Sequence, residues 1–150
     1  MAQSLAMNLI HLIYSTKNRD ASLSALLRPK LFAYQAGILQ KLDCPAIVIG
    51  GALDHVHTLF VLSKNCALCD VVEALKKGSS KWIKTQDSRL DCFHWQNGYG
   101  AFSIGQSQVA RVRAYIEGQE EHHRKLSFQD EFRLFLKRYR MKYDEATVWD

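Results

Sequence analysis

The apolar run Met7–Ser15 constrains the fold most, because it is nearly continuous rather than alternating with polar residues. A strand with this pattern is covered on both faces and lies inside a sheet. β-rich runs follow at Ala46–Ile49, at His55–Leu62, and at Trp95–Ile104, where glycines interrupt the pattern. Gly50-Gly51 predicts a turn between the second and third runs. We therefore expect a sheet that contains these four strands.

Helical periodicity separates and follows the strands. Pro29 favours a helix that begins there and ends at Asp43-Cys44-Pro45, and Asp70 is placed to cap a second helix. A third is predicted from Ser107 to His123, and Ser127 with Asp130 opens a fourth that continues to Tyr139. The order β-α-β-β-α-β plus two helices matches the split-βαβ, ferredoxin-like arrangement. We therefore expect one α+β domain over residues 1–150, with an antiparallel sheet whose first and third strands are central.

Charge permits a polyanionic partner. The 150 residues contain 20 Lys and Arg against 15 Asp and Glu, a net charge of +5. Any one basic segment is ordinarily a solvated helix face, but three such segments together favour nucleic acid. They comprise Lys17 and Arg19; Lys76, Lys77, Lys81 and Lys84; and Arg133, Lys137, Arg138, Arg140 and Lys142.

Two further observations bear on the protein's surroundings. No stretch of eighteen apolar residues is present, and no basic region precedes the first apolar run, so we expect neither a membrane span nor a signal peptide. A cytoplasmic location follows by default. Cys66 and Cys69 have the spacing of a zinc knuckle, but no second Cys or His pair follows at the required distance. Reduced structural thiols are the better interpretation.

His55-Val56-His57 is the most informative motif for function, and it lies inside the apolar run Leu53–Leu62. Alternate side chains of a strand share a face, so the two imidazoles lie about 7 Å apart along it. They are placed to converge on one metal ion or one phosphate. For an isolated His-x-His, two histidines on the wetter face of a strand are the commoner arrangement.

Tyr115 favours the functional interpretation. Tyr115, Gln119 and His122 recur at i, i+4 and i+7, which places them on one helix face. A tyrosine nucleophile has an ordinary pKa near 10, so it needs a base or a phosphate polarised by a metal. Gln119 offers the metal an oxygen, whereas His122 or His123 offers nitrogen instead, and spacing does not choose among them. Asp54 adjoins the motif, as a turn carboxylate or as a partner of its histidines.

The sequence resembles the single-tyrosine HUH transposases of small bacterial insertion sequences, of which the REP-associated tyrosine transposases are close relatives. The resemblance extends over nearly the whole chain. It is carried by His55-Val56-His57, by Tyr115-Ile116-x-x-Gln119 with His122-His123-Arg124, by His11-Leu12-Ile13-Tyr14-Ser15-Thr16-Lys17-x-Arg19, by Trp95-Gln96-x-Gly98-Tyr99-x-x-Phe102-Ser103 and by Ser127-Phe128-x-x-Glu131-Phe132.

The resemblance implies a DNA strand transferase that acts on single-stranded ends folded into hairpins. Tyr115 is then the nucleophile that becomes linked to a 5′ phosphate and releases a 3′ hydroxyl. His55, His57 and Gln119 are then the ligands of a divalent metal, Mg or Mn, and the protein works as a homodimer. Gly105 and Gly118 are candidate points of flexibility. The candidate DNA-binding side chains are Lys17, Arg19, Lys76, Lys77, Lys81, Lys84 and Arg124.

Two alternatives stand beside this interpretation. A nucleic-acid-binding regulator on the same fold would use the basic segments without chemistry, but the aromatic pattern of RNA-binding modules is not evident in strands one and three. An HUH nickase of the relaxase or replication type would share the chemistry, although those enzymes are usually longer.

Overall fold

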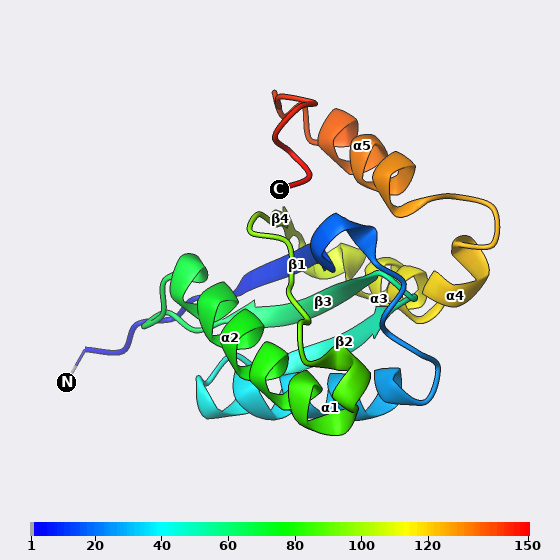
Figure 1. Ribbon diagram of the computed structural model, residues 1–150. Helices are drawn as coiled ribbons and strands as arrows, with labels where there is room; N and C mark the ends of the chain where they lie inside the picture. Colours follow the sequence, from blue (N-terminus) through cyan, green and yellow to red (C-terminus); the bar gives the residue numbers. More distant parts are fainter. Residues whose placement is uncertain (1) are drawn as a thin grey trace.

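The computed structural model describes residues 2–150 (Figure 1). Its strands are β1 (Asn8–Ser15), β2 (Ala46–Gly51), β3 (His55–Leu62) and β4 (Gly100–Ile104). Its helices are α1 (Leu27–Lys41), α2 (Leu68–Gln86), α3 (Val109–Glu117), α4 (Gln119–His122) and α5 (Phe128–Arg138). Short 3-10 turns cover Lys17–Arg19, Ser88–Leu90 and Gln106–Gln108.

The four strands form one sheet in the order β2-β3-β1-β4. Each neighbouring pair is antiparallel, and Ile13 of β1 lies opposite His57 of β3. This arrangement confirms the predicted α+β fold with β1 and β3 at the centre. The position of β1 between two partners explains why its sequence is apolar almost throughout, since both of its faces are covered.

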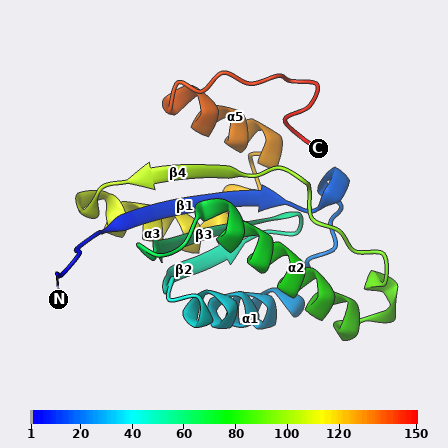
Figure 2. The ribbon, with the colours of Figure 1, turned by 90° about the vertical axis from the view of Figure 1, so that its left-hand side faces the viewer.

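Helices cover both faces of the sheet (Figure 2). Helices α1 and α2 pack on one face, where Leu12, Tyr14, Val56 and Phe60 form the main hydrophobic core. On the other face, Ile13 and Phe102 pack against α5, while α3 lies against β2 and β3. Because successive strand residues alternate, the side chains of His55 and His57 face α3, α4 and α5, away from α1 and α2.

Gly50 and Gly51 end β2, so the predicted turn at these residues is wrong; the turn follows at residues 52–54. Space explains Gly50, because a Cβ atom there would lie 2.4 Å from the carbonyl oxygen of Ile116 in α3. The glycine lets the backbone of α3 approach the sheet closely. Ile116 neighbours Tyr115, so this contact also sets the depth of the tyrosine.

Several predicted boundaries need correction. The helix predicted from Ser107 to His123 is divided at Gly118, which caps α3 before α4 begins. Helix α2 begins without a side-chain cap, and Asp70 lies within its first turn rather than at its N-cap. Only the second half of the run Trp95–Ile104 is a strand, since Trp95 makes just an isolated bridge to Thr16. The start of α5 is as predicted: the Ser127 hydroxyl accepts a hydrogen bond from the Asp130 amide.

The segment after α5 folds back and holds this helix in place. The ring of Trp149 packs on Phe132, and the guanidinium of Arg133 lies over the indole. The Gly98 amide donates to the Asp150 carbonyl at 2.8 Å, and Arg19 donates to the carbonyl of Trp149 at 2.6 Å. Across residues 2–150, no helix has the length and apolar character needed to cross a membrane. All four cysteines are free thiols.

Candidate active site

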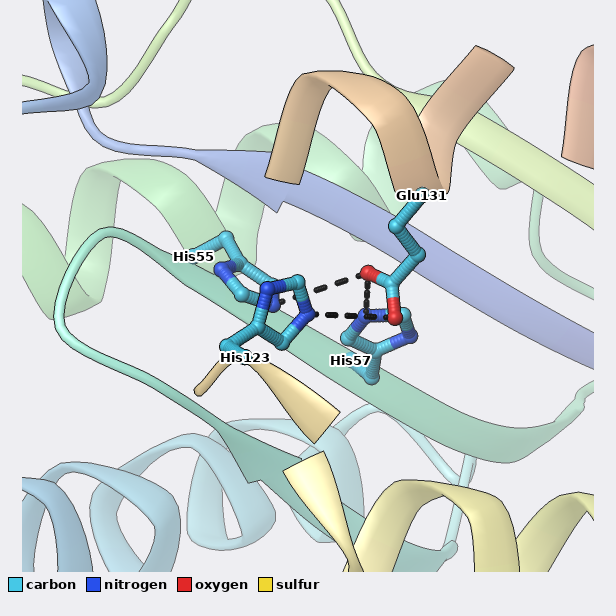
Figure 3. Close-up of side chains that lie close together, drawn as sticks. All are labelled: His55, His57, His123 and Glu131. Atoms are coloured by element: carbon cyan, nitrogen blue, oxygen red, sulfur yellow. Dashed lines mark hydrogen bonds and ion pairs between the residues drawn. The ribbon is translucent and has the colours of Figure 1, made fainter. Parts of the chain in front are cut away.

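His55 and His57 lie side by side on β3, as predicted, with ring centroids 5.2 Å apart. Both have an exposed fraction of 0%, so they do not lie on the wetter face of the sheet. The cause is α5, which brings Glu131 down onto the two imidazoles (Figure 3). The aromatic side chains of this helix dock on Ile13 and Phe102, so the carboxylate is held above β3.

Glu131 occupies the centre of the site. Its Oε1 accepts a hydrogen bond from His57 Nε2 at 2.9 Å and lies 3.7 Å from His55 Nε2. Its Oε2 accepts from Gln119 Nε2 at 3.1 Å and from the Tyr115 hydroxyl. The residues that the sequence predicted as metal ligands and nucleophile therefore meet around one carboxylate, all within a single protomer.

The structure distinguishes His122 from His123. Nε2 of His123 lies 3.1 Å from Glu131 Oε2, and its ring centroid is 4.2 Å from that of His55. His122 is exposed and places its ring edge against Tyr115. His123 is therefore the member of the pair that faces the cluster.

A second layer of side chains orients the two strand histidines. Asp54 Oδ1 accepts from His55 Nδ1 at 2.7 Å, which is the supporting role considered for this residue. His11 of β1 makes the equivalent contact to His57, with 2.8 Å between His11 Nε2 and His57 Nδ1. Both contacts leave the Nε2 atoms directed at Glu131 and Gln119.

The arrangement of lone pairs fits a cation. When His55 donates its Nδ1 proton to Asp54 and carries no second proton, its Nε2 presents a lone pair. The Gln119 oxygen faces that nitrogen at 2.9 Å, so two acceptors meet unless a proton or a cation lies between them. If the Gln119 amide were flipped, its oxygen would face Oε2 of Glu131, and two acceptors would meet there instead. One ligand atom from each of His55, His57, His123 and Glu131 also lies within 4.8 Å of the others, which is compatible with a divalent metal.

Burial governs the protonation of the site. Burial lowers the pKa of His57 to about 4, against the raising effect of Glu131. Burial also raises the pKa of Tyr115 above its ordinary value, and the charge of Glu131 raises it further. For Glu131, burial favours the acid, but hydrogen bonds from His123 and His57 outweigh it and hold the pKa well below the usual range. At neutral pH the site therefore contains a carboxylate and a protonated phenol.

A cavity of about 270 Å³ opens beside Tyr115 and reaches Glu131. Arg111 of α3 and Arg138 of α5 line it together with the ring of His122. Both guanidiniums lack an ion-pair partner among residues 2–150. Arg138 was part of a basic segment in the sequence, but only the fold shows that it lies beside the tyrosine.

The remaining basic candidates divide by location. Lys77, Lys81 and Lys84 lie on α2, across the sheet from the histidines. The Lys76 ammonium donates to the carbonyls of residues 96, 97 and 98 at 2.8, 3.1 and 2.6 Å, which holds α2 against this segment. Its contact with DNA stays a prediction. Lys17 is exposed, Arg19 binds the C-terminal segment, and Arg124 is exposed and pairs with Glu121.

Comparison with known proteins gives the family. The profile described as "Transposase IS200 like" matches residues 5–119. Among solved structures, a Deinococcus radiodurans protein described as a candidate transposase is 21% identical, with a TM-score of 0.63, covering 80% of this chain and 96% of that one. A REP-associated tyrosine transposase bound to a REP hairpin is 12% identical, with a TM-score of 0.57, covering 79% and 72%. At these identities the likeness is one of fold. No curated protein sequence matches. The match includes β3, α3 and the first residue of α4. The chain belongs to the IS200-like transposase family.

Proposed function

We propose that this transposase is a metal-dependent single-strand DNA endonuclease and strand transferase with Tyr115 as its nucleophile. One observation carries the proposal: the Tyr115 hydroxyl, both β3 imidazoles and the Gln119 amide converge on a single carboxylate. A phenol that only filled the core would have no need of so many polar neighbours.

His55, His57 and Gln119 are the proposed ligands of a divalent cation, Mg or Mn. The facing lone pairs of His55 and Gln119 support this assignment. When bound, such a cation polarises a non-bridging phosphate oxygen and stabilises the charge that develops there. Asp54 and His11 keep the two rings oriented with Nε2 inward, which is the orientation that ligation requires.

The chemistry assigned to Tyr115 is a transesterification. Its oxygen forms a bond to phosphorus while the bond to the 3′ oxygen breaks, so the strand ends as a 5′-phosphotyrosine and a free 3′ hydroxyl. The phenol loses its proton in this step, and the 3′ oxygen takes up a proton as it leaves. Attack by another 3′ hydroxyl on the phosphotyrosine reverses the bond changes, joins the strands and restores the phenol.

The DNA partner is proposed to be a hairpin at each element end, in keeping with the hairpin bound by the REP-associated transposase of similar fold. The cavity with Arg111 and Arg138 offers the backbone a cationic path to Tyr115. Lys17, Arg19 and Arg124, with Lys77, Lys81 and Lys84 on the far face, are proposed contacts to the rest of the hairpin. We further propose a homodimer, as the family resemblance implies.

The test is covalent capture of a single-stranded oligonucleotide that carries the element's end. With Mn²⁺, the wild-type protein should form an adduct that survives denaturing electrophoresis, and EDTA should prevent it. Tyr115→Phe should form none, whereas Tyr34→Phe, at an exposed tyrosine, should match the wild type. An adduct on Tyr115→Phe would refute the nucleophile, and unchanged cleavage by His55→Ala and His57→Ala would refute the metal site.

The second candidate is a DNA-binding regulator without chemistry, and the full burial of both imidazoles favours it. It predicts tight, salt-sensitive binding of the hairpin that needs no metal and gives no adduct. The same capture experiment, run beside a binding titration in EDTA, separates the two functions.

A further inference from the structure

We propose that Glu131 is a further ligand of the cation through Oε1 and that its Oε2 positions the hydroxyl of Tyr115. This inference rests on the proposed function and deepens it. Glu131 belongs to one of the motifs that carry the family resemblance, but the resemblance gives it no role, and it lies outside the matched region 5–119. One carboxylate would then link the cation to the nucleophile.

The first argument is burial without a compensating Lys or Arg. The exposed fraction of Glu131 is 1%, and no Lys or Arg lies within ion-pair distance of it among residues 2–150. Its neighbours are imidazoles, an amide and a phenol. An ionised carboxylate at this depth is costly unless it is paired or coordinates a metal. The imidazoles around Glu131 balance its charge only when they are protonated, whereas a divalent cation would balance it permanently.

The second argument is the direction of the two carboxylate oxygens. Oε1 lies 2.9 Å from Nε2 of His57 and 3.7 Å from Nε2 of His55. Two ligand atoms on one small divalent cation are about 3 Å apart, given bond lengths of about 2.1 Å and octahedral angles. Oε2 faces the other way and accepts the Tyr115 hydroxyl. The split assigns one oxygen to the metal and the other to the nucleophile.

The third argument is the chemistry of the ligand set. Two imidazoles and a neutral amide form a poor site for magnesium or manganese, which prefer oxygen and negative charge. Adding a carboxylate supplies both. His11 Nε2 lies 2.8 Å from His57 Nδ1, so it can accept the Nδ1 proton of His57 when His57 Nε2 is a ligand. Glu131 belongs to α5 and the two histidines to β3. A cation bound by all three would therefore also stabilise the packing of α5 on the sheet.

The test measures Mn²⁺ binding to the whole protein without DNA, from the electron paramagnetic resonance signal of the free ion. Glu131→Gln keeps the shape of the side chain but not its charge, and should raise the Kd for Mn²⁺ about 10- to 100-fold. Asp130→Asn removes a carboxylate from the exposed side of the same helix turn and should leave the Kd unchanged. Equal Mn²⁺ affinity of Glu131→Gln and the wild type would overturn the ligand assignment.

His57→Ala separates this inference from the proposed function. If His57→Ala loses Mn²⁺ while Glu131→Gln keeps it, only the role of Glu131 is wrong. If the wild type fails to bind Mn²⁺, or His57→Ala binds it normally, the metal site itself is wrong. Circular dichroism in EDTA checks folding, and Glu131→Asp, which retains the charge, should recover part of the affinity and serves if Glu131→Gln does not fold.

The positioning of Tyr115 has its own readout. At saturating Mn²⁺, Glu131→Gln should still form the DNA adduct more slowly than the wild type, because its amide holds the hydroxyl less firmly. A misplacement of about 1 Å reduces a rate about 100-fold. If saturating Mn²⁺ restores the wild-type rate, the carboxylate acts as a ligand alone, and the positioning role is wrong.

Discussion

Gly50→Ala should separate α3 from the sheet and weaken the proposed activity more than the fold. The added methyl group would meet the Ile116 carbonyl oxygen at 2.4 Å and its Cγ2 at 2.9 Å. Ordinary contact begins near 3.4 Å, so α3 must retreat by about 1 Å. Neither partner yields easily, because one is the backbone of β2 and the other that of a helix.

Two magnitudes follow from this displacement. Overpacking of this kind costs about 1–3 kcal/mol of unfolding free energy. Tyr115 precedes Ile116, so its hydroxyl moves with the helix, and a shift of about 1 Å reduces a rate about 100-fold. Urea unfolding measures the first effect, and the rate of adduct formation at saturating Mn²⁺ measures the second.

Gly37→Ala is the matched control. Gly37 lies in the interior of α1, and a Cβ atom there would have no neighbour within 4 Å. This change should therefore stabilise the protein by about 0.5–1 kcal/mol through helix propensity and leave the adduct rate unchanged. If Gly50→Ala is as stable and as active as Gly37→Ala, the close approach of α3 does not set the position of Tyr115.

Three further outcomes are expected. Lys76→Met should destabilise the fold by about 1.5–3 kcal/mol, because three carbonyls lose a charged donor, whereas Lys81→Met, at an exposed site, should change urea stability little. Arg138→Gln should make the slope of log binding constant against log salt concentration, for single-stranded DNA, shallower by about 0.7. Lys137→Gln, which removes a charge outside the cavity, is the control for a general effect of lost charge. His11→Gln should make the unfolding free energy, measured in EDTA, depend less on pH in the acid range. Burial lowers the pKa of His11 in the folded protein to about 2, so below pH 6.5 only the unfolded chain takes up this proton. The stability of the wild type therefore falls as pH falls. The slope between pH 6 and 4 should drop by up to about 1.4 kcal/mol per pH unit, and unchanged slopes would show that His11 titrates normally.

The order of apolar residues predicted the sheet because the burial of each strand face determines which positions of the sequence are apolar. The continuous apolar run of β1 requires cover on both faces, and the order of elements then leaves few topologies. The wrong predictions concern features that depend on contacts between segments distant in the sequence. Gly50 resembles a turn residue in the sequence, but it is a strand residue that α3 touches. The tyrosine helix is divided at Gly118, a candidate point of flexibility in the sequence, although the helical spacing continues past it.

The site was predicted in part for a similar reason. His55 and His57 share a face by strand geometry, and Tyr115 and Gln119 share one by helix geometry, so local spacing identified both pairs. Glu131 comes from a helix beyond both, and its distance along the chain hides the contact. A signal was present, however: Glu131 lies between Phe128 and Phe135 at helical spacing, and a carboxylate on an apolar stripe needs a partner inside the protein.

Helix α5, which covers the site, is packed too firmly against the sheet to be displaced readily when DNA binds. Phe128, Phe132 and Phe135 of α5 are buried against the sheet, and burying such a side chain contributes about 1.5–3 kcal/mol. Displacing α5 would therefore cost about 4.5–9 kcal/mol for the three side chains, before the contacts of Trp149 are counted. The cavity beside Tyr115 already reaches Glu131 and is lined by the guanidiniums of Arg111 and Arg138. A phosphate that enters there meets the two guanidiniums first and the phenol next while α5 stays in place, so Tyr115 and Glu131 are approached from the side without exposing the imidazoles.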